Sequence, residues 1–203
     1  MMAAHPPERA PFELVVIGAS WGGLDAIGCI FDQLPAGFGC AVAVVQHRNE
    51  HESSLAALLD RTTSWPVREA DDKETIEPGA LFVAPPGYHL LVDAGSFALS
   101  TDAPVQFSRP SIDVLFESAA DAYQERVIAV VLTGANDDGA LGARRIKDRG
   151  GYVIVQDPRS ANRPEMPNAA IRLADPDDVL PLELIASRLV ELCRHPQHAE
   201  RDA

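Results

Sequence analysis

The sequence has few cysteines and no apolar segment long enough to cross a membrane, and both shortages restrict the class of protein. No apolar run approaches the roughly 20 residues that a transmembrane helix needs, and residues 1–7 contain no secretory apolar region. The three cysteines, Cys29, Cys40 and Cys193, form neither a disulfide framework nor a metal-binding C-x-x-C pair, so we assign them no catalytic role. We expect a cytoplasmic protein that uses no metal and no cofactor.

Positive charge is also scarce. Lys and Arg number 17 against 30 Asp and Glu, which gives a formal net charge of -13 at pH 7. A surface of this sign disfavours nucleic acid and anionic membranes as partners. With 203 residues, of which 46% are hydrophobic, the chain is long enough to bury one substantial core. We expect one domain over residues 11–195, with disordered ends at 1–10 and 196–203.

Short apolar runs alternate with segments of helical spacing along most of the chain. The runs predict strands at 13–17, 41–46, 66–70, 127–132 and 152–156, and the helical spacing predicts helices at 24–34, 55–59, 112–122, 141–149 and 182–193. Between them, residues 80–84, 89–92 and 97–99 predict strands joined by turns, or an antiparallel hairpin. The alternation predicts an α/β fold: a doubly wound, mostly parallel sheet with helices on both faces and a short antiparallel hairpin.

The first apolar run stops abruptly at Gly18-Ala19-Ser20-Trp21-Gly22, a pattern typical of a nucleophile elbow. A glycine-rich turn before a helix can instead bind phosphate. That interpretation is disfavoured because Ser20 stands where a dinucleotide-binding loop needs its middle glycine for close backbone approach to the pyrophosphate, and bulky Trp21 follows it. The next strand also ends in Gln46-His47 rather than in the acid that binds ribose. We therefore predict acyl-group chemistry on Ser20, with a plain helix cap as the structural alternative.

Ser20, His47 and the pair Asp137-Asp138 each follow the end of a predicted strand. Neighbouring strands of a sheet lie about 4.8 Å apart, so these side chains can converge at its carboxyl edge. A hydroxyl nucleophile, an imidazole base and an orienting carboxylate are the three groups that serine hydrolysis requires. Taken alone, His47 would be explained as a histidine packed at the end of its strand. Either aspartate could cap the following helix or be the orienting carboxylate.

Five ordered motifs over about residues 13–173 resemble the catalytic domain of chemotaxis protein-glutamate methylesterases, the CheB type. They lie at 18–23, 46–47, 82–85, 108–116 and 132–140. The resemblance implies a triad of Ser20, His47 and Asp138. It also implies hydrolysis of γ-glutamyl methyl esters on the cytoplasmic helices of methylated chemoreceptors, and in some members deamidation of receptor glutamines. The triad order, Ser before His before Asp, differs from that of ordinary α/β-hydrolases.

The chain departs from the family pattern beside these residues. Trp21 stands where a small hydroxyl residue is common, and Ala135-Asn136 replaces Met-Gly. The resemblance implies backbone oxyanion donors in these turns, which we assign to Trp21 and Ala135. Arg109 either contacts an acidic receptor or is an ordinary surface residue.

The resemblance covers no receiver domain, so we expect control by a separate response regulator or constitutive activity. Two other functions stay open. The chain could be a catalytically weak adaptor that binds a receptor or regulator, or a hydrolase of small-molecule esters.

Overall fold

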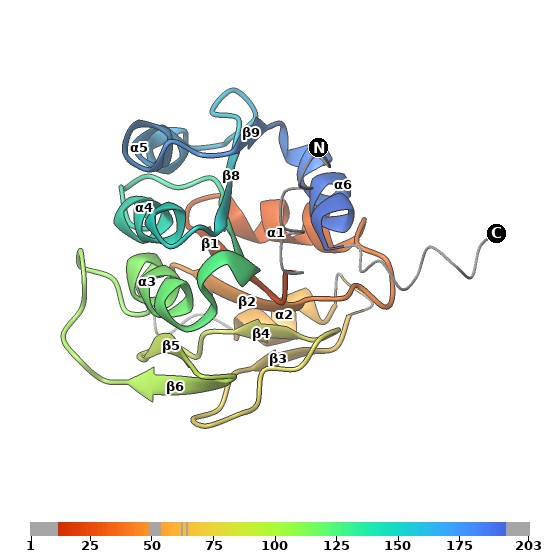
Figure 1. Ribbon diagram of the computed structural model, residues 1–203, viewed down its shortest axis with the longest axis vertical. Coiled ribbons are helices and arrows are strands. Elements are labelled where there is room, and N and C mark those ends of the chain that lie inside the picture. The colour runs from red at the N-terminus through yellow and green to blue at the C-terminus, as the bar shows by residue number, and fades with distance from the viewer. Residues whose placement is uncertain (1–11, 49–53, 62, 64, 194–203) are drawn as a thin grey trace, which may run out of the picture.

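A computed structural model describes residues 12–48, 54–61, 63 and 65–193, and its main feature is one seven-stranded sheet (Figure 1). The strand order is β3-β4-β2-β1-β7-β8-β9, and every pairing in this sheet is parallel. The strands are β1 (Leu14–Ala19), β2 (Ala41–Gln46), β3 (Val67–Glu69), β4 (Leu81–Val83), β7 (Val127–Val131), β8 (Tyr152–Gln156) and β9 (Asp178–Leu180). The doubly wound α/β prediction is confirmed. Both ends predicted to be disordered lie outside the described residues.

Helices cover both faces of the sheet (Figure 1). One face carries α1 (Gly23–Phe31), α2 (Leu55–Leu59) and α6 (Leu182–Leu192), and the other carries α3 (Ile112–Tyr123), α4 (Ala140–Asp148) and α5 (Glu165–Ala174). A short 3-10 helix, η1 (Gln124–Arg126), connects α3 to β7. Because both faces are covered, the central strands are apolar throughout rather than alternating, as a buried parallel sheet requires.

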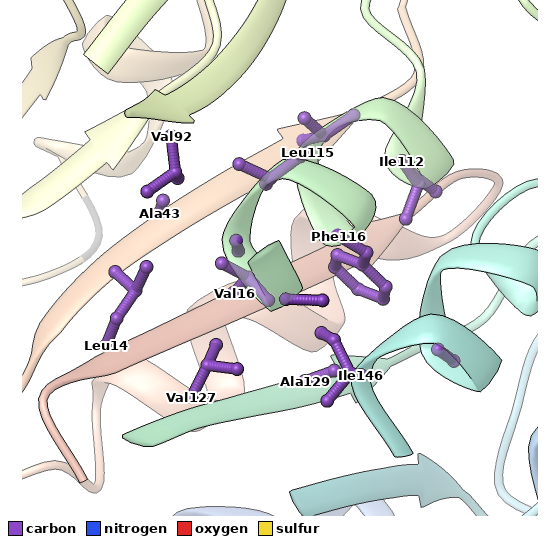
Figure 2. Close-up of a cluster of buried hydrophobic side chains, with 14 of the residues drawn as sticks. Leu14, Val16, Ala43, Val92, Ile112, Leu115, Phe116, Val127, Ala129 and Ile146 are labelled. Carbon is purple, nitrogen blue, oxygen red and sulfur yellow. The ribbon is translucent and has the colours of Figure 1, made fainter. Parts of the chain in front are cut away.

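Two apolar cores lie on opposite sides of β1. Val15 and Ile17 face α1 and α6, whereas Leu14 and Val16 face α3 and α4. Figure 2 shows the second core, in which Phe116 of α3 lies close to the sheet side chains. Residues of this size contribute about 1.5–3 kcal/mol each when fully buried. The positions of α3 and α4, which carry part of the site described below, are therefore set by this core.

The structure differs from the predicted pattern in three places. Of the three middle segments, β4 joins the main sheet in parallel, and only β5 (His89–Asp93) and β6 (Ser96–Ser100) form the separate antiparallel hairpin. The helix α5 was not predicted because Pro164 and Pro167 interrupt its pattern; both lie at its start, where a missing N–H costs little. The edge strand β9 is too short to produce a detectable alternation.

The sheet has its topological switch point at β1. The chain continues from β1 to β2 on one side, and β7 pairs with β1 on the other. In such sheets ligands bind beyond the carboxyl ends of the strands at this point. Within the described ranges, no helix is long and apolar enough to cross a membrane.

Candidate active site

Ser20 lies in the sharp turn between β1 and α1, as the elbow pattern predicts. Its backbone N–H donates to the Thr133 carbonyl oxygen at 2.9 Å, which ties the turn to the end of β7. Gly22 caps α1 with a left-handed φ of 79° and without any side-chain cap bond, so Ser20 is not the helix cap. A Cβ at Gly22 would lie 2.5 Å from Nδ2 of Asn162. The turn therefore requires glycine for both its conformation and its space.

Gln46 supports the elbow from the end of β2, a role that was not predicted from the sequence. Its Nε2 donates to the Ser20 carbonyl oxygen at 2.6 Å. A Cβ at Gly23 would lie 2.1 Å from Gln46 Oε1, so the glycine makes this close approach possible. The adjacency of Gln46 to His47 in the chain was the available signal.

His47 and Asp138 form the polar pair at the centre of the site. His47 Nε2 lies 2.7 Å from Asp138 Oδ2. The His47 side chain is 13% exposed, whereas that of Asp138 is fully buried. Asp137 is exposed, so the structure brings Asp138 and not its neighbour to the imidazole.

Asp138 is held by the N-terminus of α3. Its carboxylate accepts hydrogen bonds from Ser111 Oγ at 2.9 Å and from the backbone N–H groups of Ile112 at 2.8 Å and Asp113 at 2.9 Å. Burial opposes ionisation, but the hydrogen bonds from His47 and from these backbone groups outweigh it and lower the pKa of Asp138. Ser111 is also the N-cap of α3, and its hydrogen bond to Asp138 joins the cap to the site.

Asp113 accepts backbone N–H groups at the start of α4, as Asp138 does at the start of α3. Its Oδ1 accepts from the backbone N–H groups of Gly139 at 2.9 Å and Gly142 at 2.7 Å, and its Oδ2 accepts from Gln106 Nε2 at 2.8 Å. Burial, together with the nearby charge of Asp138, raises the pKa of Asp113 to about 7 against the opposing backbone bonds. This reciprocal capping was not predicted, because it joins residues far apart in the chain and has no local signature in the sequence.

The imidazole presents its second nitrogen to Asn136. With the Nε2 proton donated to Asp138, Nδ1 carries the free lone pair of a neutral ring. Asn136 Nδ2 lies 3.4 Å from this Nδ1, and Asn136 Oδ1 is buried without a hydrogen-bond partner among the described residues. Among the residues that the structure describes, Ser20 Oγ makes no hydrogen bond to His47. Asn136 therefore lies near the nitrogen that Ser20 would need.

A cleft of about 790 Å³ opens over these groups. Its volume is in the range of small-molecule and substrate sites. The lining includes Ser20, Trp21, His47, Phe107, Arg109 and Ala135. The structure thus brings together all five residues predicted for the site, four at the cleft surface and Asp138 behind His47.

Two backbone groups beside Ser20 are available to a ligand. The N–H groups of Trp21 and Ala135 have no acceptor within the described segments, whereas the Ser20 N–H is already used by Thr133. Arg109 donates through Nη1 to the carbonyl oxygens of Thr101 at 2.9 Å and Asp102 at 3.0 Å. Nη1 of Arg109 therefore holds the segment that forms one wall, whereas its Nε is buried without a hydrogen-bond partner among the described residues.

No group of three or more His, Cys, Asp or Glu side chains suited to a metal ion occurs in the described part of the chain. The observed arrangement instead places a hydroxyl, an imidazole with a buried carboxylate and unpaired backbone donors around one cleft. These features define a class of protein, a doubly wound α/β protein equipped for acyl transfer at the switch point of its sheet.

Comparison of this chain with known protein families and solved structures identifies its family. The family model described as CheB methylesterase matches residues 15–189, and the chain belongs to this family. The crystal structure of the Thermotoga maritima CheB methylesterase catalytic domain is similar, with a TM-score of 0.84 and 36% identity over 90% of this chain and 100% of that chain.

Two curated relatives differ in length. The putative protein-glutamate methylesterase/protein-glutamine glutaminase of Leptospira interrogans is 43% identical over 183 residues, which is 89% of this chain and 95% of the relative. The protein-glutamate methylesterase/protein-glutamine glutaminase of Symbiobacterium thermophilum is 40% identical over 184 residues, 90% of this chain but 51% of the relative. The chain therefore spans nearly all of the first relative and about half of the second.

Proposed function

We propose that this protein removes methyl groups from γ-glutamyl methyl esters on the cytoplasmic helices of methylated chemoreceptors, with Ser20, His47 and Asp138 as its catalytic triad. The observation that carries the proposal is the His47–Asp138 pair, 2.7 Å apart, in the cleft that Ser20 lines. The family and the names of both relatives support the same reaction. The predicted separate response regulator stays a prediction.

In the proposed acylation, His47 Nδ1 takes the Ser20 proton as Ser20 Oγ attacks the ester carbonyl carbon. The N–H groups of Trp21 and Ala135 stabilise the oxyanion, since both lack an acceptor among the described residues. The carbon–oxygen bond to the methoxy group then breaks. The leaving methoxide takes the proton from His47 and departs as methanol.

Deacylation uses the same groups in reverse. Water gives a proton to His47 Nδ1 and its oxygen attacks the acyl carbon. The bond to Ser20 Oγ breaks, Ser20 regains its proton, and a glutamate carboxylate remains. Asp138 keeps the imidazole oriented throughout and stabilises its cation. A receptor glutamine would form the same acyl-enzyme with ammonia as the leaving group, which the glutaminase in the relatives' names supports.

The test is methanol release from a methylated chemoreceptor fragment. We expect Ser20→Ala to lower kcat by at least about 1,000-fold, because a triad acts as a unit. Ser187→Ala is the matched control, since Ser187 is exposed on α6, away from the cleft. Release that survives in Ser20→Ala would contradict the mechanism. Binding of the fragment by the wild type without any release would support the adaptor instead.

A further inference from the structure

Two exposed side chains beside the nucleophile have no role in the triad. Trp21 directly follows Ser20 and is 66% exposed. Arg163 is exposed, and its guanidinium lies 5.5 Å from the centre of the Trp21 ring, in cation–π contact. Arg163 makes no ion pair within the described ranges. A large aromatic side chain and an uncompensated cation at the cleft edge add little to the stability of this chain, so they are available to a partner.

The backbones under these side chains are fixed by two buried residues at the end of β7, Thr133 and Gly134. Thr133 Oγ1 donates to the Trp21 carbonyl oxygen at 2.9 Å and accepts from the Arg163 N–H at 2.8 Å. The Gly134 N–H donates to the Arg163 carbonyl oxygen at 3.1 Å. Thr133 itself is 1% exposed. The indole and the guanidinium are thus mounted on a rigid support, as a preorganised contact surface requires.

Charge complementarity indicates what such a surface binds. The chain carries a net charge of -13, yet Arg163 presents a positive charge without an ion pair, within the described residues, beside Trp21, the residue that follows the nucleophile. Glu165, two residues along its segment, is exposed and makes no ion pair in the described structure, and the charged side chains that line the cleft include Asp25, Arg48 and Arg109. Arg109, across the cleft, is engaged by backbone carbonyl oxygens. Arg163 is therefore an exposed guanidinium, in contact with Trp21 and without an ion pair in the described structure, that a substrate carboxylate can reach.

We propose that Trp21 and Arg163 form a specificity platform for the protein substrate: Trp21 packs against an apolar surface of a substrate helix, and Arg163 pairs with a carboxylate one helical turn from the esterified glutamate. The proposal rests on the proposed function. Residues three or four apart on a helix have Cβ atoms about 5–6 Å apart, so a carboxylate one turn from the ester is a close neighbour of the reacting group. The platform would favour methyl esters with acidic neighbours over isolated ones.

The first test compares two substrates. One is a methylated receptor fragment with glutamates three and four residues from the ester, and the other has glutamines there. We expect Arg163→Gln to raise KM for the acidic fragment about 3- to 10-fold and to abolish the preference over the neutral one, with a smaller change in kcat. Arg172→Gln, which removes an exposed charge further along α5, is the control. An equal effect of Arg163→Gln on both fragments, or the same effect from Arg172→Gln, would overturn the pairing.

The second test needs no turnover. The chain has two tryptophans, and Trp65 is only 5% exposed, so acrylamide should quench mainly Trp21. We expect the acidic fragment to protect Trp21 from acrylamide when it binds the Ser20→Ala variant. Fragment binding measured by calorimetry without protection would overturn the role of Trp21. Methanol release by the wild type tests the proposed function separately, so protection without release would reject the esterase and keep the platform.

Discussion

His47 uses its two ring nitrogens for different tasks, and this division determines what its neighbours can do. Nε2 is paired with Asp138 at 2.7 Å, so in the proposed mechanism only Nδ1 is left to exchange a proton with Ser20. Asn136 Nδ2 lies 3.4 Å from that nitrogen. In the proposed mechanism, the amide therefore competes with the serine hydroxyl for the same lone pair.

We expect Asn136→Gly to raise kcat/KM for methyl-ester hydrolysis about 2- to 10-fold, because one weak hydrogen bond to Nδ1 is removed and such bonds contribute about 0.5–1.5 kcal/mol. The measurement is methanol release across pH 5–9. Asp137→Gly adds the same backbone freedom at an exposed neighbouring position and serves as the control. A fall in activity for Asn136→Gly alone would mean that the amide assists catalysis instead of competing with Ser20.

Helices α3 and α4 stabilise one another through exchanged carboxylates. Asp138, before α4, accepts N–H groups at the start of α3, and Asp113, in α3, accepts N–H groups at the start of α4. Negative groups are favourable at helix N-termini. The orientation of Asp138 toward His47 therefore depends on how these two elements pack.

Asp113 makes the stability of this helix pair depend on pH. Its pKa in the folded protein is about 7, above the ordinary value of 3.8, so the folded state binds a proton that the unfolded chain releases. The stability contributed by this group is present below pH 4 and is lost as pH rises toward 7. We expect Asp113→Asn, measured by chemical denaturation between pH 4.5 and 7.5, to remove this slope.

Asp113→Ala is the contrasting variant. It leaves the buried N–H groups of Gly139 and Gly142 without an acceptor, and each such loss costs about 1–3 kcal/mol. Asn retains an oxygen for both groups and so separates the effect of charge from that of capping. An unchanged pH slope in Asp113→Asn would show that another group titrates in this range.

The whole molecule is stabilised by two apolar cores, and the one under α3 and α4 also supports the site. Phe116 is fully buried in it (Figure 2). We expect Phe116→Ala to lower the free energy of unfolding by about 3–5 kcal/mol through the cavity it creates. Leu184→Ala, on exposed α6 surface, should change it by less than about 0.5 kcal/mol. Denaturant unfolding measures both, and a loss under about 1 kcal/mol for Phe116→Ala would contradict the packing.

Local signals in the sequence determined the elements and their order. Apolar runs mark β1, β2, β7 and β8 because a covered parallel sheet buries both faces of its strands. The glycines after Ser20 mark the sharp turn, in which Gly22 has the left-handed φ that favours glycine. These signals were sufficient to place Ser20, His47 and an aspartate at one edge of the sheet.

Only the tertiary structure shows which aspartate, Asp137 or Asp138, contacts His47, and that β4 pairs with the main sheet. It also brings Asp113, Asn136 and Arg163 to their partners. Each of these outcomes depends on residues far apart in the chain. Asp138 and Ile112, for example, are 26 positions apart and meet because α3 and α4 pack on the same sheet face. A periodic pattern records which face of an element is buried, but not which element covers it.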